Sequence, residues 1–141
     1  MECCRNSTAG RDCGSPWQGH KTSSRFVWKA TGFFSRIQRG ELKAQTADTV
    51  IFEAVFTLQG ESYLASREVI REGILSLIGM PGLEMTNKQR LRRAFDLYVE
   101  ENMSFGDAYH VALMEHLGIE EIASFDRDFE RVPGIRRREP H

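Results

Sequence analysis

The chain has 141 residues, of which 40% are hydrophobic and 28% are charged, and its formal net charge is −1. This length suits one domain with an adequate core, and the composition is that of an ordinary globular protein. The near-neutral charge excludes a generally basic nucleic-acid-binding protein, and no apolar run is long enough to span a membrane. Because the sequence also shows no secretory signal pattern, we expect a cytoplasmic protein.

Residues 1–24 differ in composition from the rest of the chain. They are rich in Gly, Ser, Arg and Cys and follow neither the helical nor the strand apolar period, so we expect them to be disordered or irregular. All three cysteines fall within the first 13 residues and, with His20, offer four zinc donors, but their spacing matches no common zinc site. We therefore predict an atypical segment at 1–28 and a folded domain at 29–141.

Helical and short apolar patterns alternate along the remainder of the chain. This alternation indicates an α/β fold with a short, mostly parallel sheet. In chain order the patterns predict helices at 26–39, 49–58, 67–78, 89–102 and 104–117, and short strands at 42–45, 83–85, 122–125 and 135–138.

Several residues mark the expected helix boundaries. Asp48 is a suitable N-cap for the helix at 49–58, and Thr86 with Gln89 forms a T-x-x-Q capping box for the helix that follows. Gly40 is placed to end the first helix. The helix at 49–58 is apolar nearly all round, which predicts that it is buried.

Glu53 is the only charged residue within that apolar helix. A lone carboxylate is rarely buried without a partner. Two interpretations stay open: Glu53 faces water through a gap in the packing, or it faces a cation or a base.

Residues 104–129 carry two further acids at informative places. Ser104 and Asp107 form an S-x-x-D pattern that begins a helix, and Gly118 suits a left-handed C-terminal cap. Asp126 follows a short apolar strand, and ligands collect at the carboxyl edge of parallel sheets. Asp107 and Asp126 are therefore either half of a carboxylate cluster that needs a hard cation, or simply a helix-start residue and a turn residue.

Arginines crowd the C-terminal end of the chain, where they are either a solvated face or a surface that steers a polyanion. They are Arg127, Arg131, Arg136, Arg137 and Arg138.

The order of these acids resembles the PIN domain, specifically the small toxins of VapC type. The phrases SFGDAYHVALME at 104–115 and SFDRDFERVPGI at 124–135 carry the resemblance together, and it extends over about residues 29–140. The resemblance implies a three-layer α/β/α fold around a parallel sheet. It also implies a ribonuclease that hydrolyses RNA phosphodiester bonds with Mg²⁺ or Mn²⁺.

On the matching positions, Glu53, Asp107 and Asp126 are implied to be the catalytic acids and metal ligands, with Asp128 assisting from the same loop. A carboxylate-held divalent ion supplies an activated water and stabilises charge on the phosphoryl oxygens. His110 lies one turn after Asp107, and a packed or surface histidine is the simpler interpretation of it. The implied partners are an RNA substrate, a VapB-type antitoxin and a second copy of the chain in a homodimer.

The sequence departs from the family at its beginning. The family starts with a central strand that ends in an Asp-Thr-Asn type motif, and no such motif occurs before Phe33. Asp12 follows no apolar run, so the role of that Asp is not assigned to it. The fold is therefore expected to lack its first strand, and residues 1–28 are interpreted as the product of an altered reading frame or a misassigned start. The alternative function is a catalytically impaired PIN remnant that only binds an antitoxin or another subunit.

Overall fold

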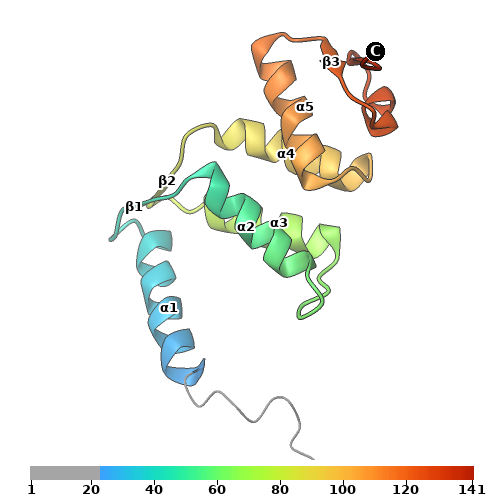
Figure 1. The fold of residues 1–141 in the computed structure, drawn as a ribbon. Helices are drawn as coiled ribbons and strands as arrows, with labels where there is room; N and C mark the ends of the chain where they lie inside the picture. The colour runs from blue at the N-terminus through green and yellow to red at the C-terminus, as the bar shows by residue number, and fades with distance from the viewer. Residues whose placement is uncertain (1–22) are drawn as a thin grey trace, which may run out of the picture.

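The structure is a computed structural model that describes residues 23–141 (Figure 1). The four possible zinc donors and most of the segment that we expected to be irregular lie within residues 1–22, outside the described residues. The expectation is wrong for residues 23–28, because α1 begins at Ser23. The elements in chain order are α1 (Ser23–Gln38), β1 (Ala44–Gln45), α2 (Asp48–Gln59), α3 (Arg67–Ile78), β2 (Leu83–Glu84), α4 (Lys88–Glu100), α5 (Phe105–Leu117), β3 (Glu121–Ala123), the 3₁₀ helix η1 (Arg127–Arg131) and β4 (Arg136–Arg138).

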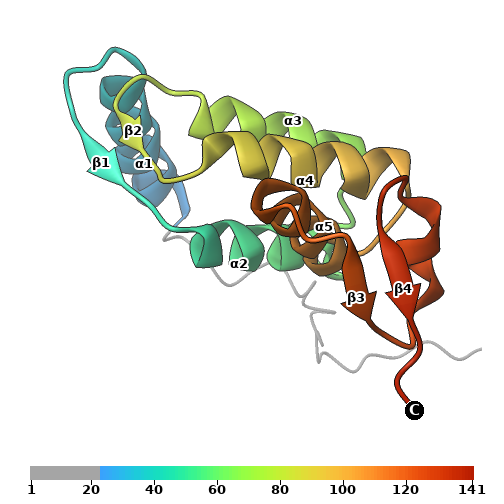
Figure 2. The same cartoon turned by 90° about the horizontal axis from the view of Figure 1, so that it is seen from above.

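The expected α/β class is confirmed, and the strands pair in parallel. β1 pairs with β2, with Ala44 opposite Leu83, and β3 pairs with β4, with Glu121 opposite Arg136. The two pairs remain separate two-stranded sheets, and both views show them apart with helices between them (Figures 1 and 2). The part of the chain that the structure describes has no strand before Ala44, so no central strand joins the two pairs.

The hydrophobic core is centred on α4 and α5, which make the most extensive contact in the fold. Phe95 of α4 packs against Phe105 of α5 with ring centroids 4.7 Å apart, and Tyr98 meets the same Phe105 ring edge-on at 5.7 Å. All three rings are almost fully buried. Helices α2 and α3 pack around this pair, so most of the burial that stabilises the domain is helical.

Arg67, at the start of α3, ties together the end of α4 and the start of α5. Its guanidinium donates to the carbonyl oxygen of Tyr98 at 2.7 Å and to that of Met103, and it lies 4.4 Å from the centroid of the Tyr98 ring. Gln59 of α2 donates to the Tyr98 hydroxyl at 2.7 Å. Arg67 thereby holds the turn that leads into α5, and Gln59 holds the side chain of Tyr98 in α4.

Two predicted helix caps are wrong. The N-cap of α2 is Ala47 rather than Asp48, and the N-cap of α4 is Asn87, in the left-handed region, rather than Thr86. The Asp48 carboxylate instead accepts from Arg90 at 2.7 Å and from the Tyr109 hydroxyl. A charged partner within a partly buried cluster is a stronger attraction for Asp48 than a helix-terminal N–H.

The expectation that α2 is buried all round is also wrong. Ile51 and Val55 are buried, but Val50 is 51% exposed and Phe56 is 63% exposed. Their face of the helix also carries Glu53, which is exposed. The prediction of full burial took the apolar composition of α2 to mean that other elements pack on every side of the helix, and on this side they do not.

The glycine expectations are confirmed. Gly40 and Gly118 follow α1 and α5 with φ angles of 71° and 68°, the left-handed conformation that glycine adopts without steric cost. None of the helices described here is both long and apolar enough to cross a bilayer.

Candidate acidic site

Asp107 is held at the start of α5 by a reciprocal contact with Ser104. The Ser104 hydroxyl oxygen accepts from the Asp107 backbone N–H at 3.1 Å, and the hydroxyl donates to the Asp107 carboxylate at 2.5 Å. The carboxylate therefore stands in the first helical turn, where the helix dipole favours negative charge. The predicted helix start is confirmed, and His110, one turn later, is exposed.

Asp126 lies in the turn between β3 and η1 rather than directly after the strand. Its backbone N–H donates to the Ser124 hydroxyl at 3.0 Å, and its carboxylate accepts from the Asp128 N–H at 2.9 Å. Asp128 forms an ion pair with Arg131 at 2.9 Å. Both acids therefore have a local structural role in η1, and Asp126 remains exposed to solvent.

Glu53 is carried by a helix that docks on the first turns of α5. Its neighbour Phe52 packs edge-on against Phe105 at 5.0 Å and against Tyr109 at 4.9 Å between ring centroids. These two aromatic residues flank Asp107 in the sequence. Glu53 and Asp107 are thus positioned by the same α2–α5 contact.

The acids do not form a metal centre in the arrangement described. Among residues 23–141, no group of three or more His, Cys, Asp or Glu side chains is arranged to hold a metal ion. The carboxylate oxygens of Asp107, Asp126 and Asp128 are instead engaged by a hydroxyl, an N–H and a guanidinium. With these contacts in place, the three acids do not form a ready-made site for a divalent ion.

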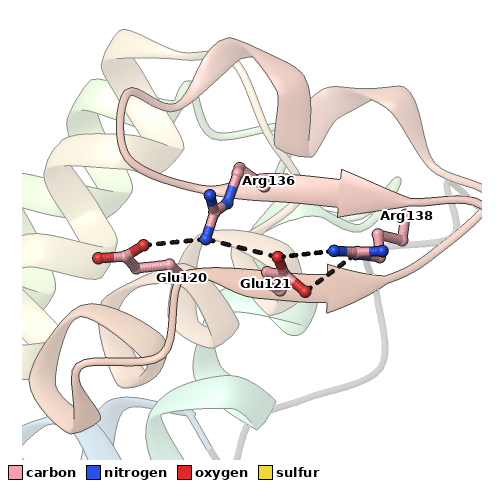
Figure 3. Close-up of polar contacts among 4 residues, drawn as sticks. All are labelled: Glu120, Glu121, Arg136 and Arg138. Carbon is pink, nitrogen blue, oxygen red and sulfur yellow. Dashed lines mark hydrogen bonds and ion pairs between the residues drawn. The ribbon is translucent and has the colours of Figure 1, made fainter.

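The C-terminal arginines are largely neutralised by glutamates. Figure 3 shows Arg136 bridging Glu120 and Glu121, at 3.2 and 3.4 Å, across the β3–β4 pair. In the same view, the Arg138 guanidinium donates to Glu121 at 2.9 and 3.0 Å. The paired arrangement favours the solvated face over a surface that steers a polyanion.

A second polar cluster was not expected from the sequence. Asp48, Arg90 and Tyr109 come from α2, α4 and α5, and the Arg90 guanidinium carbon lies 5.1 Å from the Tyr109 ring centroid. Burial, and then the hydrogen bond to Asp48, raises the pKa of the Tyr109 hydroxyl. Because these residues are far apart in the sequence and each fits an ordinary surface role, no local pattern identifies the cluster.

Comparison with known proteins gives consistent results. The family described as PIN domain matches residues 31–135 of the chain. A VapC ribonuclease of Mycobacterium bovis and the ribonuclease VapC13 of Mycobacterium tuberculosis are each 36% identical to the chain over 75 residues, which is 50% of this chain and 56% of each relative. The chain therefore spans little more than half the length of the curated relatives it matches.

Proposed function

We propose that this chain, which belongs to the PIN domain family, is a toxin ribonuclease of VapC type. The observation that carries the proposal is the family match over residues 31–135, supported by two similar proteins whose names state that they are ribonucleases. The substrate is RNA, and the reaction is hydrolysis of its phosphodiester bonds.

The proposed catalytic residues are Glu53, Asp107 and Asp126, with Asp128 beside them, and the proposed metal is Mg²⁺ or Mn²⁺. Carboxylate oxygens are the donors that these hard cations prefer. Two features support the assignment: Asp107 is fixed in the first turn of α5 by Ser104, and α2, which carries Glu53, packs on that turn.

The proposed partners are a VapB-type antitoxin, which silences the toxin, and a second copy of the chain in a homodimer. Apolar side chains exposed on two helices support an interaction role. Trp28 and Phe33 of α1 and Phe56 of α2 are all open to solvent. We also propose that the protein acts in the cytoplasm, where RNA and an antitoxin are both present.

A cleavage assay tests this function. A fluorescently labelled RNA is incubated with the full chain in Mn²⁺ or Mg²⁺, with and without chelator. We expect metal-dependent cleavage that Asp107→Asn lowers by about a hundredfold or more, as loss of transition-state charge stabilisation does. The matched control is Asp96→Asn, because the ion pair of Asp96 with Arg71 is a weak one at 4.0 Å.

Two outcomes contradict the proposal. One is cleavage by Asp107→Asn at the rate of the unsubstituted chain, which would show that Asp107 is not a catalytic residue. The other is an absence of cleavage by a chain whose helical circular dichroism shows it to be folded, which removes the activity itself.

A further inference from the structure

Arg137 of β4 differs from the arginines on either side of it because its guanidinium is largely withdrawn from solvent. Its side chain is 9% exposed, whereas those of Arg136 and Arg138 are 66% and 73% exposed. Exposed ion pairs contribute little to stability, but a guanidinium that leaves water needs partners for its donors. The partners of Arg137 therefore indicate what this side chain holds.

The Arg137 guanidinium joins the two ends of the segment that carries Asp126. Its Nη1 donates to the carbonyl oxygen of Ser124, the residue directly after β3, at 2.9 Å. Its Nε and Nη2 each lie 2.7 Å from Oε1 of Glu130, which belongs to η1. A longer contact of 3.6 Å joins Nη1 to Glu139. One side chain on β4 thus connects the end of β3 to η1.

Ser124 connects Arg137 to Asp126. Its N–H donates to the backbone carbonyl of Arg138 at 3.0 Å, its carbonyl accepts from Arg137, and its hydroxyl accepts from the Asp126 N–H at 3.0 Å. The Asp126 carboxylate accepts in turn from the Asp128 N–H at 2.9 Å, at the start of η1. Because Arg137 also holds η1, these contacts form a closed ring around Asp126.

We propose that Arg137 is the positioning residue for Asp126, an inference that rests on the proposed function. Arg137 supplies no metal ligand itself. It fixes Ser124 and η1 to the same point of β4, so that the Asp126 carboxylate between them keeps one orientation. Carboxylates bind a metal well only when neighbouring groups hold them in place, and the rigid fork of a guanidinium suits such a junction.

Two measurements on the full chain test the proposal. Solvent-exchange NMR follows the amides of Asp126 and Asp128, and calorimetric titration gives the affinity for Mn²⁺. In Arg137→Met we expect both amides to exchange about tenfold faster and Mn²⁺ to bind about tenfold more weakly, as loss of a group that orients a metal ligand predicts. Arg137→Lys should restore only part of either value, because an ammonium does not present a planar fork to Ser124 and Glu130 together.

Arg138→Met is the matched control. Arg138 also meets a glutamate through two nitrogens, as Figure 3 shows, but it is exposed and its side chain does not contact the ring. We expect this variant to leave the exchange of both amides and the affinity for Mn²⁺ unchanged.

A second variant keeps the test independent of whether Arg137→Met folds. Glu130→Gln weakens the same ring from a position whose side chain is 52% exposed. We expect it to speed exchange of the Asp126 and Asp128 amides. Added to Arg137→Met, it should have no further effect, because both substitutions act on one contact.

Three results overturn the proposal while the unsubstituted chain binds Mn²⁺. Unchanged amide exchange in Arg137→Met and Glu130→Gln means that the ring does not hold Asp126. Faster exchange with unchanged Mn²⁺ affinity means that Arg137 supports the β3–β4 pair alone. An equal loss of affinity in Arg138→Met means that general loosening of the strands is the cause. An unsubstituted chain that binds no Mn²⁺ overturns the proposed metal site itself, and this inference with it.

Discussion

Ser104 is the residue that fixes the side chain of Asp107, and this contact is testable by itself. Its hydroxyl caps α5 with a 3.1 Å bond, whereas Ser66 caps α3 with a 3.4 Å bond. We expect Ser104→Ala to lower the free energy of unfolding by about 1 kcal/mol, within the usual range for a lost N-cap. Ser66→Ala is the matched control and should cost less, as urea denaturation will show. Equal losses for the two variants would contradict a special role for Ser104.

Gly82 lies where the end of α1, β1 and β2 approach one another. A Cβ atom built there would stand 2.2 Å from the carbonyl oxygen of Leu42 and 2.7 Å from that of Ile37, both backbone atoms. We therefore expect Gly82→Ala to lower the thermal midpoint, because backbone must move to admit the methyl group. The control is Gly73→Ala in α3, where the Cβ meets nothing and should add about 0.5–1 kcal/mol of stability. A neutral Gly82→Ala result would show that this approach is looser than the structure indicates.

The residues whose roles were predicted correctly from the sequence interact with their neighbours in the sequence. Ser104 caps the helix that follows it, and Gly40 and Gly118 adopt left-handed conformations at helix ends. Asp48 and Thr86 were assigned as caps and are not, because distant partners decide their roles: Asp48 is drawn to Arg90 of α4. Nothing within a few residues of Asp48 reveals that partner.

At the scale of elements, Arg67 of α3 contacts both the end of α4 and the turn before α5 through one guanidinium. Its bonds to the carbonyl oxygens of Tyr98 and Met103, and its position over the Tyr98 ring, hold the turn before α5. We expect Arg67→Met to lower the free energy of unfolding by about 2–3 kcal/mol, as the loss of charge-assisted hydrogen bonds predicts. Arg67→Lys should recover only part of this, because an ammonium lacks the planar fork.

The control for this prediction is Arg71→Met, one turn further along α3, since the ion pair of Arg71 with Asp96 is a weak one at 4.0 Å. Urea denaturation gives both values. If Arg67→Met lowers the free energy of unfolding no more than Arg71→Met does, the α3–α4–α5 junction is held by apolar packing alone.

The β3–β4 pair should weaken in acid. The hydrogen bond from Arg138 lowers the pKa of the Glu121 carboxyl, against a smaller opposing effect of desolvation and with added attraction from Arg138 and Arg136. A carboxyl whose pKa is lower in the folded than in the unfolded state stabilises the fold above its unfolded value, about 4.3, and this contribution is lost as pH falls through the lowered value.

We therefore expect Glu121→Gln to be less stable than the unsubstituted chain near neutral pH and equally stable at low pH. Thermal midpoints measured across this range will show it, and salt should shrink the difference because the pair is exposed. Glu72→Gln on α3 is the control. A difference that persists unchanged into acid would assign the effect to packing rather than to charge.

At the scale of the whole molecule, the alternation of elements was predictable and the pairing of strands was not. Five helices and four strands, counted over residues 23–141, fall close to their predicted positions, because apolar period and helix-end chemistry are local signals. The two sheets are separate, and the described residues have no strand before Ala44 that could join them. One side of α2 is open to solvent at Val50 and Phe56.

The candidate site shows the same limit of sequence reasoning. The positions of Glu53, Asp107 and Asp126 on α2, α5 and the β3–η1 turn follow from local patterns and from family resemblance. How closely the three carboxyls approach one another depends on how α2, α5 and β3 are held together. The packing of α2 on α5 includes the contacts of Phe52 with Phe105 and Tyr109, which no sequence pattern reveals.

The central proposal, that Glu53, Asp107 and Asp126 hold the divalent metal of a ribonuclease, is tested most directly by calorimetric titration of the full chain with Mn²⁺. We expect saturable binding that Glu53→Gln, Asp107→Asn and Asp126→Asn each weaken by about tenfold or more, as the loss of one carboxylate ligand or of its partner does. Asp96→Asn should bind as the unsubstituted chain does. Binding that survives all three substitutions unchanged, or no binding at all, would contradict the claim.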